Sequence, residues 1–150
     1  MSIDLYVLSN KALSSVGEWQ RSIDSEKFAL VLPADTVMKE LHGFLPVQLD
    51  AGQMGFECTH TPASEILEML GTESREWTHA LAFYTQSLDE LLAAYIAAAA
   101  YAKTTNGVVF DPQEERLMSP VEAFWVAEQM KADLPAQKEI LREALRKLTR

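Results

Sequence analysis

The sequence predicts one α+β domain over residues 1–150, with a mixed sheet of about five to seven short strands, a central alanine-rich helix and C-terminal helices. Three observations lead to this prediction. The chain has 150 residues, a length that suits one domain with a sizeable core. Residues 87–103 are apolar on nearly every side when drawn as a helix, which is typical of a buried helix. Short apolar runs bounded by turn residues lie on both sides of it, as is typical of strands.

The alanine-rich helix has clear start and stop signals. Ser87 and Glu90 form a capping box at its beginning. Asn106 or Gly107 can adopt the left-handed conformation that ends a helix. The apolar run over 91–102 would form about 18 Å of helix, too short for a bilayer core of ~30 Å. We therefore expect this helix to fill the centre of the domain.

The first part of the chain predicts a strand–helix–strand unit. Residues 4–8 and 28–32 are apolar runs, and Ser9-Asn10 offers a cap for a helix over 11–24. A unit of this length suits a right-handed crossover between parallel strands. Other expected strands cover residues 43–49, 55–59, 79–84, 108–110 and 116–118.

Turn residues organise the middle of the chain. Asp50-Ala51-Gly52 predicts a hairpin turn, and Pro46 places its strand towards the edge of the sheet. A helical turn is expected over 36–41. A short helix is expected over 62–70, with Thr61 as its cap, Pro62 at its first position and Gly71 at its end.

Two helices are expected in the C-terminal segment, residues 119–150. Ser119-Pro120-Val121-Glu122 is a strong helix start, and Leu134-Pro135 is expected to break the first helix. The second, over 136–148, carries an apolar stripe that predicts docking onto the domain or onto a second copy of the chain. The stripe consists of Ile140, Leu141, Ala144, Leu145 and Leu148.

The charge is negative and unevenly distributed. The net charge is −9, but residues 137–150 alone carry +3 and residues 1–136 carry −12. An acidic body repels nucleic acids and anionic membranes and attracts basic proteins. We therefore expect no nucleic-acid or membrane partner, and a basic protein as the class of partner. The alternative is that the acidic surface serves only solubility.

The N-terminus and the cysteine content predict a cytoplasmic protein. Asp4 precedes the first short apolar stretch, whereas a signal peptide begins with basic residues and has a longer apolar region. Cys58 is the only cysteine, so no internal disulfide can form.

The same cysteine raises the question of catalysis. Cys58 and His60 would share one face of a strand. Two ligands are too few for a zinc site, but a cysteine–histidine nucleophile is conceivable. The simpler interpretation is a core cysteine with a histidine near the strand end. Because no phosphate-binding or hydrolase motif occurs, we expect a non-enzymatic protein without catalytic residues, metal or cofactor. A small-molecule or metal-binding enzyme using Cys58 and His60 is the alternative.

Four residues are candidates for contact with a protein partner. Asp111, Glu114 and Glu115 follow the strand over 108–110, in a turn that lacks the ligand spacing of a calcium loop. Trp77 follows a polar segment and is the tryptophan expected at the surface.

Trp19 and Trp125 are interpreted differently. Both lie on amphipathic helices, where a large aromatic side chain usually anchors the core.

One stretch resembles a known class of proteins. After the alanine-rich helix come Thr105-Asn106-Gly107-Val108-Val109-Phe110-Asp111-Pro112-Gln113, a short polar turn and Ser119-Pro120. This helix–strand–turn–helix pattern, from Tyr95 to Pro120, resembles that of small uncharacterised bacterial α+β proteins, some of which are of the immunity type in polymorphic toxin systems. It covers about a sixth of the chain. The resemblance implies a non-enzymatic bacterial protein-binding protein and supplies no catalytic residue.

Overall fold

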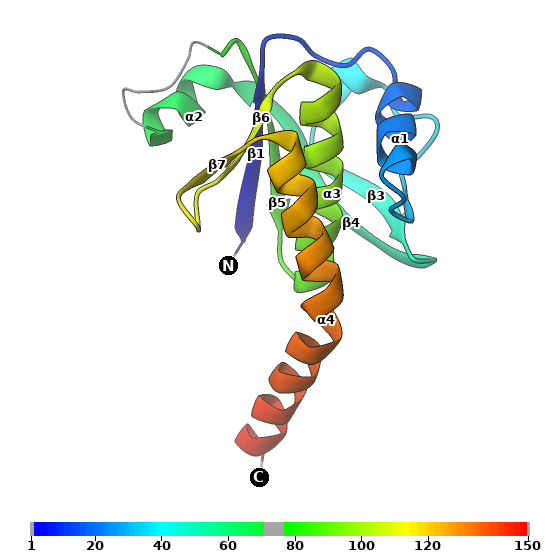
Figure 1. The fold of residues 1–150 in the computed structure, drawn as a ribbon, viewed down its shortest axis with the longest axis vertical. Helices are drawn as coiled ribbons and strands as arrows, with labels where there is room; N and C mark the ends of the chain where they lie inside the picture. The colour runs from blue at the N-terminus through cyan, green and yellow to red at the C-terminus, as the bar shows by residue number, and fades with distance from the viewer. Residues whose placement is uncertain (1, 71–76, 150) are drawn as a thin grey trace.

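The computed structural model describes residues 2–70 and 77–149, and these form four α-helices and a seven-stranded sheet (Figure 1). The predicted α+β class is therefore confirmed. The strands are β1 (Ile3–Ser9), β2 (Leu30–Val31), β3 (Phe44–Leu49), β4 (Gly52–Pro62), β5 (His79–Thr85), β6 (Val108–Asp111) and β7 (Arg116–Met118). The helices are α1 (Val16–Ser25), α2 (Ala63–Leu70), α3 (Leu88–Thr105) and α4 (Pro120–Leu148), with a 3₁₀ turn η1 (Met38–Glu40).

The sheet has the order β2-β3-β4-β5-β1-β6-β7, and every pairing between the described strands is antiparallel. The expected mixed sheet is therefore wrong. β1 and β2 do point in the same direction, but β3, β4 and β5 lie between them. The strand–helix–strand unit thus crosses the sheet without pairing its two strands. With only two residues, β2 offers too little backbone to serve as a central strand.

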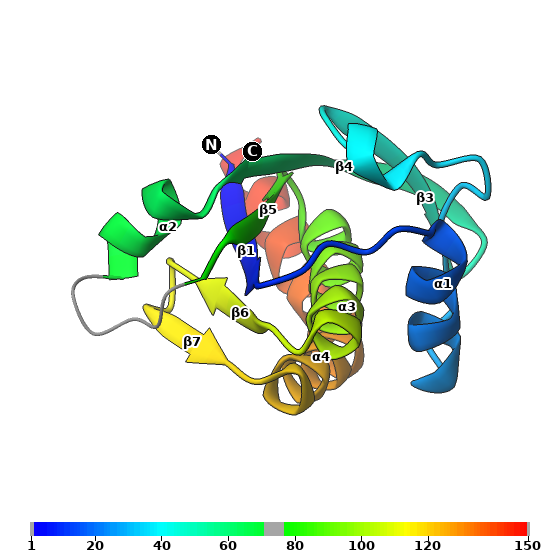
Figure 2. The ribbon, with the colours of Figure 1, turned by 90° about the horizontal axis from the view of Figure 1, so that it is seen from above.

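The helices are divided unequally between the two faces of the sheet. The sheet curves around α3, with α1 and α4 packed against the same helix (Figure 2). One large core, which contains Leu5, Phe83 and most of α3, lies between them. α2 packs on the opposite face, over a smaller cluster that includes Tyr6 and Phe110. Among residues 2–70 and 77–149, α2 is the only helix on that second face, and we call the part that it leaves uncovered the open face.

The central helix forms as its sequence predicts. The Ser87 side chain accepts a hydrogen bond from the backbone N–H of Glu90. Asn106 ends the helix in the left-handed conformation, with a φ of 55°. The small alanine side chains let α1 approach closely enough for Trp19 Nε1 to donate to the Ala97 carbonyl at 2.8 Å. Trp19 is fully buried, so its predicted place in the core is confirmed.

The first helix begins later than the sequence suggests. Its cap is Ser15, which accepts from the Glu18 N–H, and the expectation that Ser9 or Asn10 caps it is wrong. Ser9 completes β1 and donates its hydroxyl to the Lys11 carbonyl. Asn10 accepts from the Thr78 N–H. Both side chains are therefore engaged elsewhere.

The β3–β4 hairpin is confirmed, with Leu49 paired to Gly52 across the turn. β4 is longer than expected and includes Pro62, so α2 begins at Ala63. At Pro46, β3 pairs on one side only, with β4, because the described pairing with β2 is limited to Gln48 and Leu49. The missing N–H of Pro46 is therefore tolerated, as at an edge. The expected helix end at Gly71 and the polar segment at 73–76 lie outside the described residues.

The C-terminal segment is one helix of 29 residues with Pro135 inside it, and the predicted break at Leu134-Pro135 is wrong. A proline removes one backbone hydrogen bond and crowds the preceding turn. Pro135 is exposed, so water can satisfy the freed carbonyl. The helix packs on the core through Phe124 and Ala127 and then extends beyond the sheet (Figure 1).

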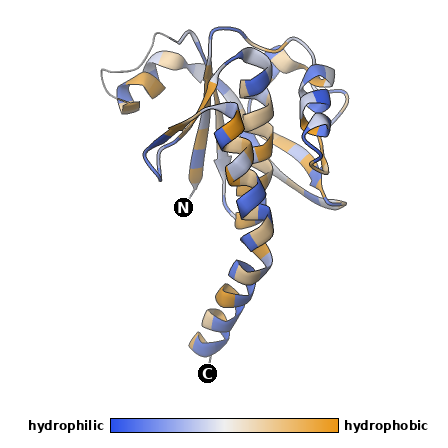
Figure 3. Ribbon diagram, in the orientation of Figure 1, coloured by the Kyte–Doolittle hydropathy of each residue, from blue (hydrophilic) through white to orange (hydrophobic). Residues whose placement is uncertain are grey.

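The side chains of this helix also differ from expectation. Trp125 is 59% exposed, so its predicted place in the core is wrong. It follows Phe124 by one residue and hence points about 100° away from the buried face. The apolar stripe on the projecting half does not dock onto the domain: Ile140, Leu141, Leu145 and Leu148 are between 54% and 80% exposed, and apolar residues recur along this half (Figure 3).

Within residues 2–70 and 77–149, none of the helices has both the length and the apolar character that crossing a membrane requires.

Candidate functional site

The β6–β7 turn contains three of the four contact residues predicted from the sequence. Asp111 is only 6% exposed. Its carboxylate accepts from the Tyr95 hydroxyl and from the backbone N–H groups of Gln113 (3.0 Å) and Glu114 (3.3 Å). Asp111 therefore ties the turn to α3 and offers little surface to a partner. Glu114 and Glu115 are exposed at the tip of the turn.

Trp77 lies apart from this turn. It is half-buried and packs against the cluster on the second face of the sheet. The next residue, Thr78, bonds to the Ser9 carbonyl, and the neighbouring Leu8 pairs with Val108. Trp77 therefore lies near Val108, the first residue of β6, whereas Asp111 is the last residue of that strand. The structure does not bring Trp77 together with Glu114 and Glu115.

The Cys58–His60 pair has the geometry of structural residues. Cys58 is fully buried in the main core, and this burial raises the pKa of its thiol. His60 Nε2 lies 2.8 Å from the Met38 carbonyl oxygen, which fixes the imidazole against η1. Among the residues that the structure describes, no three histidine, cysteine or acidic side chains converge as metal ligands. These contacts give no support to a cysteine–histidine nucleophile.

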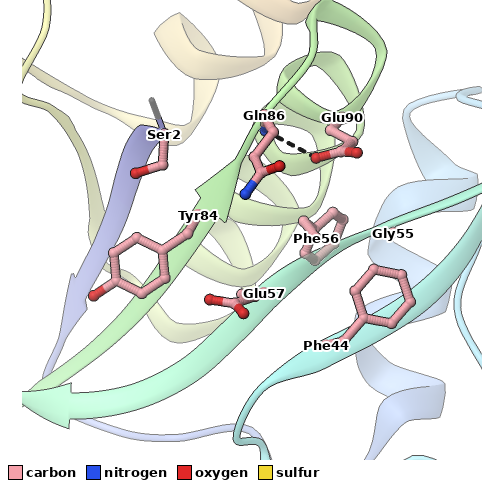
Figure 4. Close-up of a pocket in the computed structure, with 8 residues that line it drawn as sticks. All are labelled: Ser2, Phe44, Gly55, Phe56, Glu57, Tyr84, Gln86 and Glu90. Carbon is pink, nitrogen blue, oxygen red and sulfur yellow. Dashed lines mark hydrogen bonds between the residues drawn. The ribbon is translucent and has the colours of Figure 1, made fainter.

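A different group of residues lines a cleft on the open face of the sheet (Figure 4). The register of four strands places Phe44 beside Glu57, Glu57 beside Tyr84, and Tyr84 beside Asp4. Aromatic and acidic side chains therefore alternate across β3, β4, β5 and β1. We call these four residues the aromatic–acidic row.

Phe44 is the most exposed member of the row, at 65%. Its ring covers Gly55 on the neighbouring strand, where an added Cβ would overlap the ring. Gly55 therefore makes room for the ring to lie against the backbone of β4. A large apolar side chain held in this way on an open face is available to a binding partner.

The cleft beside Phe44 has a volume of about 410 Å³. A second, more apolar groove of about 770 Å³ adjoins it and shares Phe44, Gly55 and Glu90. Glu90 stands at the start of α3 and accepts from the Gln86 N–H at 2.9 Å. We refer to both hollows together as the Phe44 cleft.

The Phe44 cleft is negative and has aromatic walls. Glu57 and Glu90 line it, and no lysine or arginine stands among its lining residues in the described chain. Burial and the nearby Asp4 carboxylate raise the pKa of Tyr84, which shows that the surroundings disfavour a further negative charge. Carboxylates next to aromatic faces suit a cationic group, which gains from charge attraction and from the ring quadrupole.

Reasoning from the sequence missed this site, although a signal was present. In the strand over 43–49, Leu45, Val47 and Leu49 occupy one face, so alternation puts Phe44 on the other, with Pro46 and Gln48. A phenylalanine on the polar face of a strand indicates a surface role. The neighbours Glu57 and Tyr84 could not be found in this way, because strand register is needed to place them.

No family model matches the chain, and no curated protein matches it in sequence.

Proposed function

We propose that this chain is a non-catalytic, cytoplasmic binding protein whose partner is a basic protein, and that toxin immunity is the sharpest form of this function. The observation that carries the proposal is the aromatic–acidic row, of which Phe44, Glu57 and Tyr84 line the Phe44 cleft. It lies on a body, residues 1–136, whose net charge is −12.

The chemistry of the cleft supports a lysine or arginine as the group that is recognised. Such a side chain can place its cation near Glu57 or Glu90 and its aliphatic stem or guanidinium plane against Phe44. Exposed Phe44 also supplies apolar area, since burying an aromatic side chain contributes strongly to an interface. The adjoining apolar groove can accept a neighbouring side chain of the partner.

The overall charge supports fast association with such a partner. An acidic surface raises the encounter rate with a basic protein, and salt weakens the effect. Glu114 and Glu115, which are exposed, would contribute to this field even though they lie outside the cleft. Asp111 supports this surface only indirectly, by holding the turn that carries Glu114 and Glu115, and Trp77, which lies apart from that turn, has no part in it.

A pull-down with the purified protein tests the proposal. Bait protein is incubated with a lysate of its source organism at low salt, and captured proteins are identified by mass spectrometry. We expect a basic protein, encoded beside this gene if the function is immunity. The double variant Glu57→Lys/Glu90→Lys should lose it, because the cleft then repels a cation.

The matched control is Glu128→Lys/Glu68→Lys, which makes the same change in net charge at exposed positions outside the cleft and outside the β6–β7 turn. It should keep most of the binding. Capture of no protein, or equal loss with both double variants, would contradict recognition through the Phe44 cleft.

A further inference from the structure

The projecting half of α4 is an unpartnered helix. We call residues 136–148 the tail. The core-facing side chains of α4 end with Val126, Met130 and Leu134, which pack against the main core. Beyond them, the ion pair between Lys138 and Asp89, at 2.8 Å, joins the tail to the start of α3. Within the described part of the chain, the apolar side of the tail has no tertiary packing, since its isoleucine and leucines are more than half exposed.

The apolar side of the tail is continuous. The stripe falls at i, i+1, i+4, i+5 and i+8, which is one face of an α-helix, and its members are Ile140, Leu141, Ala144, Leu145 and Leu148. The charged side chains occupy the other side, where Arg142 pairs with Glu139 and Arg146 with Glu143. The face that would receive a partner is therefore free of these ion pairs.

We infer that two copies of this chain associate through their tails as an antiparallel helix pair. Charge complementarity argues for a second copy as the occupant. The tip of the tail is basic, through Arg146 and Lys147. Its base carries the acidic Asp133 and lies beside Asp89, which pairs with Lys138. Antiparallel packing sets the basic tip of each copy against the acidic base of the other.

A parallel arrangement lacks this advantage. It would place the two basic tips together and align the two helix dipoles in the same direction, and both effects are unfavourable. In the antiparallel pair, the stripe of each tail covers that of the other, since an isologous interface uses the same surface twice. Thirteen helical residues span about 20 Å, so the interface is small and the dimer should depend on concentration.

Sedimentation equilibrium over the micromolar range tests the association. We expect a reversible monomer–dimer equilibrium for the wild-type protein. Leu141→Glu should weaken it at least about tenfold, because it places a charge in the middle of the stripe. Val121→Glu is the matched control, since Val121 is exposed on the same helix but outside the tail, and it should leave the dimer unchanged. A wild-type monomer at all concentrations, or a dimer that Leu141→Glu does not affect, would overturn the proposal.

Disulfide trapping tests the orientation. Gln137→Cys and Leu148→Cys lie three helical turns apart on the same side of the tail. Mixed and oxidised together, the two variants should form the mixed disulfide in preference to either symmetric one. Predominance of symmetric disulfides would overturn the antiparallel arrangement. Wild-type protein is the control and should not cross-link, because its Cys58 is buried.

Discussion

A single carboxylate, that of Asp111, holds the β6–β7 turn and the central helix together. It receives two backbone N–H groups of its own turn and the hydroxyl of Tyr95 on α3. Both side chains are buried. The contact therefore acts in a setting where an unpaired polar group is costly.

Removing the Tyr95 hydroxyl should destabilise the fold. We expect Tyr95→Phe to lower the free energy of unfolding by about 1–3 kcal/mol, because it leaves one buried carboxylate oxygen of Asp111 without this donor. Urea denaturation measures the loss. A double-mutant cycle adds the variant Asp111→Asn. The stability losses of the two single variants should sum to more than the loss in the double variant. Strict additivity would show that the two groups do not interact.

The thiol of Cys58 should be inert in the folded protein. It is fully buried, and burial raises its pKa, so little of the reactive thiolate forms at neutral pH. We expect a dithiobis-nitrobenzoate reagent to modify native protein roughly a thousandfold more slowly than protein unfolded in urea. Rapid modification of the native state would instead support the alternative in which Cys58 acts as a nucleophile paired with His60.

At the scale of elements, the β3–β4 hairpin decides where Phe44 lies. Its two turn residues, Asp50 and Ala51, both have positive φ, at 51° and 67°, as in the two-residue turns whose twist matches that of the strands. The turn therefore sets the register that places Phe44 beside Glu57. Aspartate accepts this conformation readily, whereas alanine does not.

Replacing Ala51 by glycine should stabilise the hairpin. Glycine adopts positive φ without a steric penalty, so we expect Ala51→Gly to raise the free energy of unfolding by about 0.5–1 kcal/mol. Thermal or urea denaturation provides the measurement. The control is Ala34→Gly, at an exposed turn position where φ is not positive. This change should be neutral or destabilising. Equal effects from both changes would contradict strain at Ala51.

In the β3–β4 hairpin the local sequence signal agrees with the structure, whereas in the C-terminal helix the two disagree. Pro135 is a helix breaker by its own chemistry, yet α4 continues through it. The first half of the helix is anchored on the core by Phe124 and Ala127. With that half fixed, the additional residues extend an existing helix and need no new nucleus.

At the scale of the whole molecule, the tyrosines couple stability to alkaline pH. The pKa of each of the four tyrosines is raised, with burial as the main cause. Above pH ~10 the unfolded chain loses these phenolic protons while the folded chain retains them. Unfolding then releases protons, and a rise in pH favours the unfolded state.

We therefore expect the free energy of unfolding to fall as pH rises through about 10, with an earlier contribution from Cys58 above pH ~8.5. Urea midpoints at neutral pH and at several alkaline values test this. Tyr95→Phe should show a shallower decline, because one of the retained protons is gone. A constant stability up to pH ~11 would contradict the burial of these groups.

The amino-acid sequence by itself determined the elements whose signals are local. The cap at Ser87, the end at Asn106, the hairpin at Asp50-Ala51 and the apolar character of α3 all depend on neighbouring residues, so the α+β class followed from them. Sequence also marked the acidic body and the basic tail, because charge needs no fold to be counted.

Tertiary structure alone decided what lies beside what. Strand order inserted three strands between β1 and β2, and strand register assembled Phe44, Glu57, Tyr84 and Asp4 from four separate segments. Packing buried the side chain of Asp111, left Trp125 exposed and carried α4 past Pro135. The physical reason is common to all of these: pairing and burial are contacts between residues distant in the chain, and local conformational preferences do not encode them.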